Sequence, residues 1–150
     1  MSGALDDALA AVRARGLRLS AARRLVLHAL AVADGPMSAE QIAAGVGGRV
    51  PRSDLASVYR NLDVLERAGI VGHVHLGHGP GAWALRAGGP RAYLACERCG
   101  DYRVVPAREL AAVRAHIRRA FGYDAAFDHF PVVGLCASCA GATPASPHPH

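Results

Sequence analysis

The sequence of 150 residues contains no lysine, few aromatic residues and no long apolar run. Aromatic residues make up only 5% of the chain although 51% of its residues are hydrophobic, so the interior must be built mainly from Ala, Val and Leu. This composition suits helices with small apolar faces and argues against disorder of the whole chain. No run approaches the roughly 20 apolar residues of a membrane span, and no basic leader precedes an apolar block at the N-terminus. We therefore expect a cytoplasmic protein with no membrane partner.

The basic side of the net charge of +5 consists of arginine alone. Arginine pairs bidentately with phosphate groups and guanine edges, although a chain rich in Arg and Ala can equally reflect the base composition of a genome. The charge favours a polyanionic partner without identifying it. We recognise no Ser-His-Asp set, phosphate-binding loop or paired carboxylate site in the sequence, so we do not expect an enzyme.

The first half of the chain has the punctuation of four consecutive helices. Ser20 and Ser38 are suitable N-caps, and Gln41 completes a capping box with Ser38. Ser53 is expected to cap the fourth helix, which ends at Gly69. The expected helices cover residues 5–15, 20–35, 38–47 and 53–68. The last two helices, with a tight connector between them, predict a helix-turn-helix.

After residue 69 the pattern becomes that of strands. Residues 70–76 and 82–86 predict a hairpin, and a hairpin that directly follows a helix-turn-helix is a wing. Two glycines and a proline in residues 87–91 predict a hinge. Beyond the hinge we expect strands at 92–96, 101–105 and 129–135, a helix at 107–121 and a disordered tail at 141–150. The predicted fold is α+β, with a winged helix-turn-helix domain at 1–86 and a small α/β dimerisation domain at 92–140.

The fourth predicted helix has an apolar side and a small, basic side. Its apolar side is formed by Leu55, Val58, Leu62 and Leu65. Arg60 projects almost opposite this stripe, where a helix lying in a DNA groove would present it to the duplex. An ordinary solvated polar face is the alternative, but the order of the surrounding elements favours DNA binding. The candidate DNA-binding residues are Arg49, Arg52, Ser53, Ser57, Tyr59 and Arg60.

The four cysteines form two C-x₂-C pairs, Cys96 with Cys99 and Cys136 with Cys139. Two such pairs can supply the four sulfur ligands of a tetrahedral structural zinc site. A unit of roughly 60 residues buries too little surface to be secure alone, and a structural zinc ion would stabilise it. A redox pair or two disulfides are the alternatives, and disulfides are poorly suited to a reducing compartment.

The run LASVYRNLDVLERAGIV, together with CERCG and the later GLCASC, resembles the ferric uptake regulator family of bacterial repressors. The resemblance covers residues 16–139. It implies a winged-helix domain followed by a dimerisation domain, DNA contacts by Tyr59 and Arg60, and one structural zinc ion on the four cysteines of each protomer. It also implies a homodimer that reads a palindromic operator in double-stranded DNA.

The family's usual regulatory metal ligands are missing from this sequence. The resemblance places them at Pro36, Ala84, Arg91 and Tyr93. None of these residues binds zinc or iron well, because arginine has no acceptor and a tyrosine phenol is protonated at neutral pH. Whether metal sensing is retained therefore stays open.

A second group of potential metal ligands lies elsewhere in the sequence. His73 and His75 alternate on one face of the first wing strand, and His78 lies in its turn. Asp128 and His129 precede the last strand. These five residues could form a relocated regulatory site for zinc, iron or nickel. Alternatively, the wing histidines face solvent or the DNA backbone, and His129 packs or caps.

Three functions are compatible with these patterns. The first is a homodimeric DNA-binding transcription regulator, which we expect to be a repressor. The second is a zinc-stapled module that binds another protein, and the third is a thiol redox protein that uses the C-x₂-C pairs.

Overall fold

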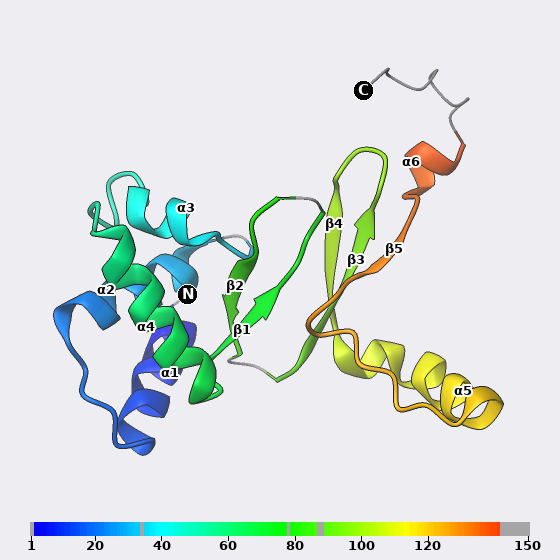
Figure 1. Cartoon of the computed structure of the whole chain (residues 1–150), viewed down its shortest axis with the longest axis horizontal. Helices are drawn as coiled ribbons and strands as arrows, with labels where there is room; N and C mark the ends of the chain where they lie inside the picture. Colours follow the sequence, from blue (N-terminus) through cyan, green and yellow to red (C-terminus); the bar gives the residue numbers. More distant parts are fainter. Residues whose placement is uncertain (1, 34, 78, 87–88, 142–150) are drawn as a thin grey trace.

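The structure is a computed structural model, in which all residues except 1, 34, 78, 87–88 and 142–150 are described. Four helices and a two-stranded hairpin form one half, and a three-stranded sheet with one long helix forms the other (Figure 1). The elements of the first half are α1 (Ser2–Ala14), α2 (Ala21–Val32), α3 (Ala39–Ala44), α4 (Leu55–Arg67), β1 (Val71–Val74) and β2 (Ala82–Leu85). Those of the second half are β3 (Arg91–Cys96), β4 (Tyr102–Pro106), the 3₁₀ helix η1 (Ala107–Leu110), α5 (Ala111–Phe121), β5 (Val132–Gly134) and α6 (Ala137–Ala140).

Local capping explains where the helices of the first half begin. The Ser20 side chain accepts a hydrogen bond from the Arg23 amide at the start of α2. Ser38 and Gln41 form the predicted capping box at the start of α3. The apolar faces of α1 to α4 meet in one core together with β1, and the most buried large side chains in it are Leu27, Ile42, Leu62 and Leu65.

Three expectations about the fourth helix are wrong. Its N-cap is Asp54, whose carboxylate accepts from the Ser57 amide at 2.8 Å, and not Ser53. Leu55, expected in the apolar stripe, is 39% exposed and is the first residue of the helix. The connector from α3 is not tight: it spans residues 45–54 and is held by a bridge between Val46 and Val50.

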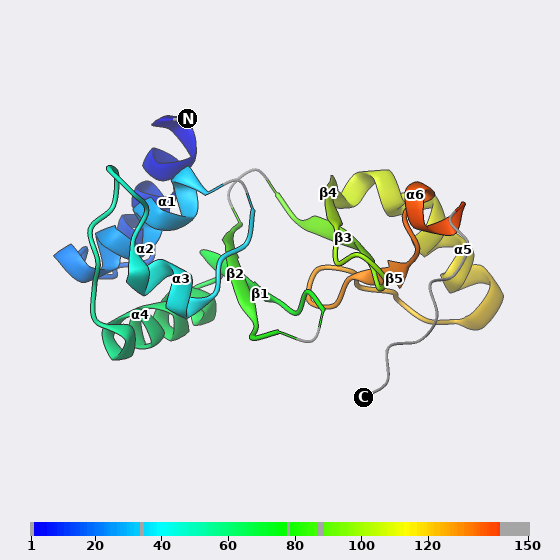
Figure 2. The same ribbon diagram turned by 90° about the horizontal axis from the view of Figure 1, so that it is seen from above.

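The wing is an antiparallel hairpin in which His73 is paired with Trp83. Trp83 also exchanges two backbone hydrogen bonds with Met37, at 2.8 and 3.0 Å. The segment that leads into α3 thus lies against the wing and fixes its position next to the helices. Figure 2 shows the hairpin between the helices of the first half and the sheet of the second.

The sheet of the second half has the strand order β4-β3-β5, with β3 and β4 antiparallel and β3 and β5 parallel. Its edge strand β5 has no buried residue, and α5 buries none of its side chains either. The apolar stripe expected on residues 107–121 is therefore present but uncovered within one chain. The exposed apolar side chains in this half include Val113, Phe121, Tyr123, Phe130 and Val133.

Several boundaries differ from those expected. The first helix already begins at Ser2. Arg91, expected in the hinge, is the first residue of β3. The final strand is restricted to Val132–Gly134, because Pro131 has no amide hydrogen to pair. Most of the expected tail lies outside the described residues. No helix among the described residues has the length and apolar character needed to span a membrane.

Candidate metal centres and DNA-reading helix

Parallel pairing of β3 with β5 brings the two cysteine pairs together. Cys96, the last residue of β3, is opposite Gly134 of β5, and the chain then continues into Cys136 and Cys139. The turn after Cys96 needs a left-handed residue, which Gly100 supplies with φ of +75°. The ligand atoms of all four cysteines lie within 4.8 Å of one another.

This arrangement fits a zinc ion. The Sγ atoms of Cys99 and Cys136 are 3.8 Å apart, and a tetrahedron with Zn–S bonds of about 2.3 Å has sulfur–sulfur edges of about 3.8 Å. Backbone hydrogen bonds from Cys99 and Cys136 lower the pKa of Cys96 to about 6, whereas sharing a hydrogen bond with Cys136 raises the pKa of Cys139 to about 12. A bound zinc ion favours the thiolate form of every ligand cysteine, including Cys139, whose neighbouring sulfur atoms otherwise favour the protonated thiol. The predicted structural zinc site is confirmed.

The outer side of α4 faces solvent. Arg49, Arg52, Tyr59 and Arg60 are exposed, and Ser53 and Ser57 are half-buried. The Tyr59 hydroxyl donates to Glu40 of α3 at 2.9 Å. This bond raises the pKa of Tyr59. The pKa of Glu40 is lowered, mainly by a hydrogen bond from its own backbone amide and secondarily by the bond from Tyr59. Tyr59 is thus both exposed and held in one direction.

A polar contact that no sequence pattern predicted fixes α4 against α2. Asn61 is 8% exposed, although it was not part of the expected apolar stripe. Its side-chain oxygen accepts from Arg23 at 3.1 Å, and its amide donates to the Ser57 carbonyl at 2.9 Å. Both ends of the side chain are therefore satisfied, which sets the rotation of α4.

The places of the family's usual regulatory ligands lie around one cavity of about 240 Å³. Pro36, Ala84, Arg91 and Tyr93 all line it. The other described lining residues are Ala4, Leu30, Ala31, Ala33, Gly35, Leu85 and Val104. No imidazole or carboxylate is among these residues, and burial raises the pKa of Tyr93 further. A regulatory metal does not fit this donor set.

Three of the histidines expected at a relocated site do lie together. The centroids of the His73 and His75 rings are 4.6 Å apart, and the His129 ring lies 5.5 and 5.3 Å from them. We call these three residues the histidine cluster. His73 and His75 come from the wing strand β1 and its continuation, whereas His129 precedes β5, so the cluster joins the two halves of the chain.

Backbone contacts hold this junction. The His75 amide donates to the His129 carbonyl at 3.2 Å, and His129 Nδ1 lies 3.0 Å from the His73 carbonyl. Phe130, which the sequence did not point to, stacks on His75 at 5.5 Å and packs edge-on against His129 at 4.6 Å. An aromatic side chain thus covers one side of the cluster.

The His73 ring lies parallel to Trp83, with centroids 4.4 Å apart and an interplanar angle of 7°. Burial, and secondarily the neighbouring His75, lower the pKa of His73. His73 Nε2 has no hydrogen-bond partner among the described residues. Among the described residues, the four cysteines are the only group whose ligand atoms lie within 4.8 Å of one another. The three imidazoles must therefore turn before they can share an ion.

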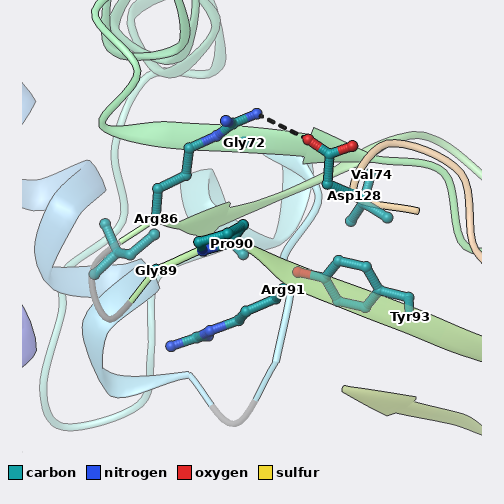
Figure 3. Close-up of a pocket in the computed structure, with 10 residues that line it drawn as sticks. Gly72, Val74, Arg86, Gly89, Pro90, Arg91, Tyr93 and Asp128 are labelled. Atoms are coloured by element: carbon teal, nitrogen blue, oxygen red, sulfur yellow. Dashed lines mark ion pairs between the residues drawn. The ribbon is translucent and has the colours of Figure 1, made fainter. Parts of the chain in front are cut away.

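Two other residues expected at this site are not in the cluster. The Asp128 carboxylate instead faces Arg86 at 3.8 Å, across a cavity of about 320 Å³ (Figure 3). Arg91, which lines the same cavity, points away from that pair. His78 lies outside the described residues.

Comparisons with known proteins agree with this architecture. The model of the Ferric uptake regulator family matches residues 14–129. The chain is 24% identical over 138 residues to the peroxide operon regulator of Bacillus subtilis, covering 90% of this chain and 92% of that protein. It is 22% identical over 138 residues to the peroxide-responsive repressor of Staphylococcus epidermidis, covering 90% and 89%.

Solved structures show the same fold. The ferric uptake regulator of Helicobacter pylori aligns with a TM-score of 0.68 at 17% identity, over 93% of this chain and 96% of that one. That of Pseudomonas aeruginosa, solved with manganese, aligns with a TM-score of 0.66 at 23% identity, over 85% and 96%. The chain belongs to the ferric uptake regulator family of DNA-binding transcription regulators, as its motifs predicted.

Proposed function

We propose that the chain is a homodimeric repressor that reads a palindromic operator with α4 of each protomer. The observation that carries this proposal is the exposed basic side of α4, directed by its caps and by Asn61, in a chain of this family. The exposed Arg60 and Tyr59 would face the bases, with Ser57 near a phosphate group. Arg49 and Arg52 precede the helix N-terminus, where the helix dipole also favours a phosphate.

The uncovered apolar surface of the second half supports the homodimer. Phe121 is 70% exposed, Tyr123 is 74% exposed and Val133 is 58% exposed. Large apolar side chains left exposed in one half of a protein favour a protein–protein interface there. Covering it with a second copy would place two α4 helices on one duplex, and half-sites about one helical turn apart then follow from the two-fold symmetry.

We further propose that the histidine cluster is the regulatory metal site. Neutral imidazoles suit zinc, nickel and iron, and two of the three ligands belong to the wing while the third belongs to the dimerisation domain. A metal ion bound there would tie the wing to the dimer and favour one spacing of the two α4 helices. Metal binding is therefore expected to raise the affinity for the operator. As part of the same proposal we place the boundary between the two domains at residues 87–90, directly before β3.

Two other functions compete with this one. A zinc-stapled module that binds a protein would need no basic face on α4, and a thiol redox protein would hold zinc weakly. The arrangement of the four cysteines argues against the thiol redox protein, because closed Cys₄ zinc sites are structural.

Binding to duplex DNA decides between the alternatives. A duplex is first selected from a random-sequence pool by the wild-type protein, and its affinity is then measured at increasing salt. The proposal predicts a palindromic selected sequence, with affinity that falls steeply as salt is added. A pool that yields no enriched sequence, or an affinity independent of salt, would favour a protein-binding module.

A further inference from the structure

We propose that Trp83 couples the histidine cluster to Tyr59, so that metal binding at the cluster changes the orientation of a DNA-reading side chain. This inference rests on the proposed metal site. It adds a physical route from that site to α4 which does not depend on how the two halves of the dimer are spaced.

The Trp83 indole contacts both ends of this route. One contact is the parallel His73 ring, whose centroid is 4.4 Å from that of the indole. The other is the Tyr59 ring, with a centroid distance of 6.1 Å and an interplanar angle of 80°. The Trp83 backbone is fixed by its two hydrogen bonds to Met37. A change that starts at His73 therefore reaches Tyr59 through the side chain of Trp83 and not through a shift of the strand.

The proposal requires a second arrangement of the His73 ring besides the observed stacked one. In the stacked arrangement its Nε2 atom is directed at Gly81, so closely that a Cβ on residue 81 would lie 1.9 Å from it. That nitrogen is shielded from solvent and has no partner among the described residues. Nε2 therefore faces away from a shared ion, and no choice of ring nitrogens on His73, His75 and His129 brings three ligand atoms together among the described residues. Ligation by all three imidazoles thus requires the His73 ring to turn off the indole.

The free energies of these two arrangements are balanced by opposite contributions. Stacking on Trp83 favours the observed one, whereas an unsatisfied buried nitrogen opposes it. The Trp83 Nε1 atom is likewise buried without a partner in the described part of the chain. A metal ion that binds only the turned ring would therefore shift the population between two defined states, which is what an allosteric element requires.

Tyr59 is placed to respond to such a shift. Its ring forms a T-shaped pair with the indole, its hydroxyl donates to Glu40, and 42% of the residue remains exposed. The indole and Glu40 thus hold the phenol from two sides. When His73 leaves the indole, Trp83 can relax into the vacated space, and the support on one side of Tyr59 changes.

The test uses the full-length, zinc-loaded dimer and the duplex selected by the wild-type protein. Ni²⁺, and in a parallel arm Zn²⁺, is titrated into the wild type, Trp83→Phe, Trp83→Leu and His75→Ala. Metal binding is measured by calorimetry and duplex affinity by anisotropy. Trp83→Phe keeps an aromatic ring between His73 and Tyr59, and Trp83→Leu keeps apolar volume without it. Circular dichroism confirms the fold of each variant.

Trp83 is the single tryptophan of the chain, so its emission reports the stacked pair directly. Zn²⁺ has a filled d shell and no redox chemistry, which makes it the suitable ion for this readout. We expect the emission to change as zinc binds beyond the cysteine site in the wild type. His75→Ala, which leaves the indole untouched, should show no such change.

The proposal predicts that metal changes duplex affinity by about fivefold or more in the wild type and in Trp83→Phe. In Trp83→Leu the metal should still bind, but duplex affinity should respond to it less than in the wild type, since only the effect of the metal on the spacing of the two α4 helices remains. An undiminished response in Trp83→Leu would overturn the coupling and leave the metal site standing. If neither ion binds beyond the cysteine site, or if both bind equally well to His75→Ala, the proposed metal site fails and the coupling with it.

Discussion

His129 Nδ1 lies 3.0 Å from the backbone carbonyl oxygen of His73. A carbonyl oxygen only accepts hydrogen bonds, so in the neutral ring Nδ1 carries the proton and Nε2 has the free lone pair. Histidines that bind metals are typically oriented by such a contact to their second nitrogen. The fold has therefore fixed the tautomer of one imidazole of the histidine cluster before any ion arrives.

The lowered pKa of His73 predicts how stability depends on pH. Burial holds the pKa of His73 in the folded chain below its ordinary value of 6.5, with a smaller contribution from His75 and an opposing one from Glu66. As the pH falls below 6.5, His73 therefore becomes protonated in the unfolded chain while it stays neutral in the folded chain. The contribution of neutral, buried His73 to the stability of the fold is complete above pH 6.5 and is lost as the pH falls through the folded pKa.

This dependence can be measured as the midpoint of thermal unfolding between about pH 8 and pH 5. His73→Phe keeps a ring on Trp83 but has no titrating nitrogen, so its midpoint should fall less than that of the wild type. His116→Gln, at an exposed position on α5, is the matched control and should follow the wild type. Equal acid sensitivity in the wild type and His73→Phe would show that His73 does not titrate as described.

Removing Arg60 should weaken binding to the selected duplex by about 1–3 kcal/mol, because a base contact of the arginine fork is lost. The measurement is anisotropy at a fixed salt concentration. Arg108→Ala removes the same charge at an exposed position of η1 and should have little effect. If the two variants lose affinity equally, only net charge matters and α4 does not read the duplex.

Disrupting the zinc site should unfold the second half and release the dimer. Cys136→Ser leaves three sulfur ligands, and structural zinc sites contribute on the order of 10 kcal/mol to folding. Zinc content and mass in solution report the result. Ser138→Ala changes one of the two residues between the cysteines of the same pair and should keep both zinc and dimer. Retention of a full dimer by Cys136→Ser would contradict the stabilising role of zinc.

A charge on the uncovered edge strand should separate the protomers. Val133→Glu places a carboxylate on β5, where we expect the second copy to pack, and burying an unpaired charge at an interface is unfavourable. Analytical ultracentrifugation should detect monomers. Ala14→Glu adds the same charge at an exposed site at the end of α1 and should leave the dimer intact. Dimers in both variants would place the interface elsewhere.

Local patterns were sufficient to predict most elements. The Ser38 capping box depends on residues three apart, and it formed as expected. The cysteine pairs were also recognisable, because each lies within one turn. The choice between Ser53 and Asp54 as N-cap could not be made from the sequence, since both side chains suit the role and adjacent positions compete for it.

Contacts between distant residues could not be predicted in the same way. Asn61 was not singled out from the sequence, because only packing of α4 on α2 brings it to Arg23. Asp128 looked like a metal ligand, and only the approach of the wing gives it Arg86 as a partner. The stack of His73 on Trp83 depends on the register of the wing hairpin, which a single sequence does not specify.

The most direct test of the central claim counts metal ions. The zinc-loaded dimer is titrated with Ni²⁺ or Zn²⁺ and compared with His129→Ala and with Arg91→Ala, which alters the place of the family's usual regulatory ligands. We predict one further ion per protomer in the wild type and in Arg91→Ala, and none in His129→Ala. Undiminished binding by His129→Ala would contradict the assignment of the regulatory metal to the histidine cluster.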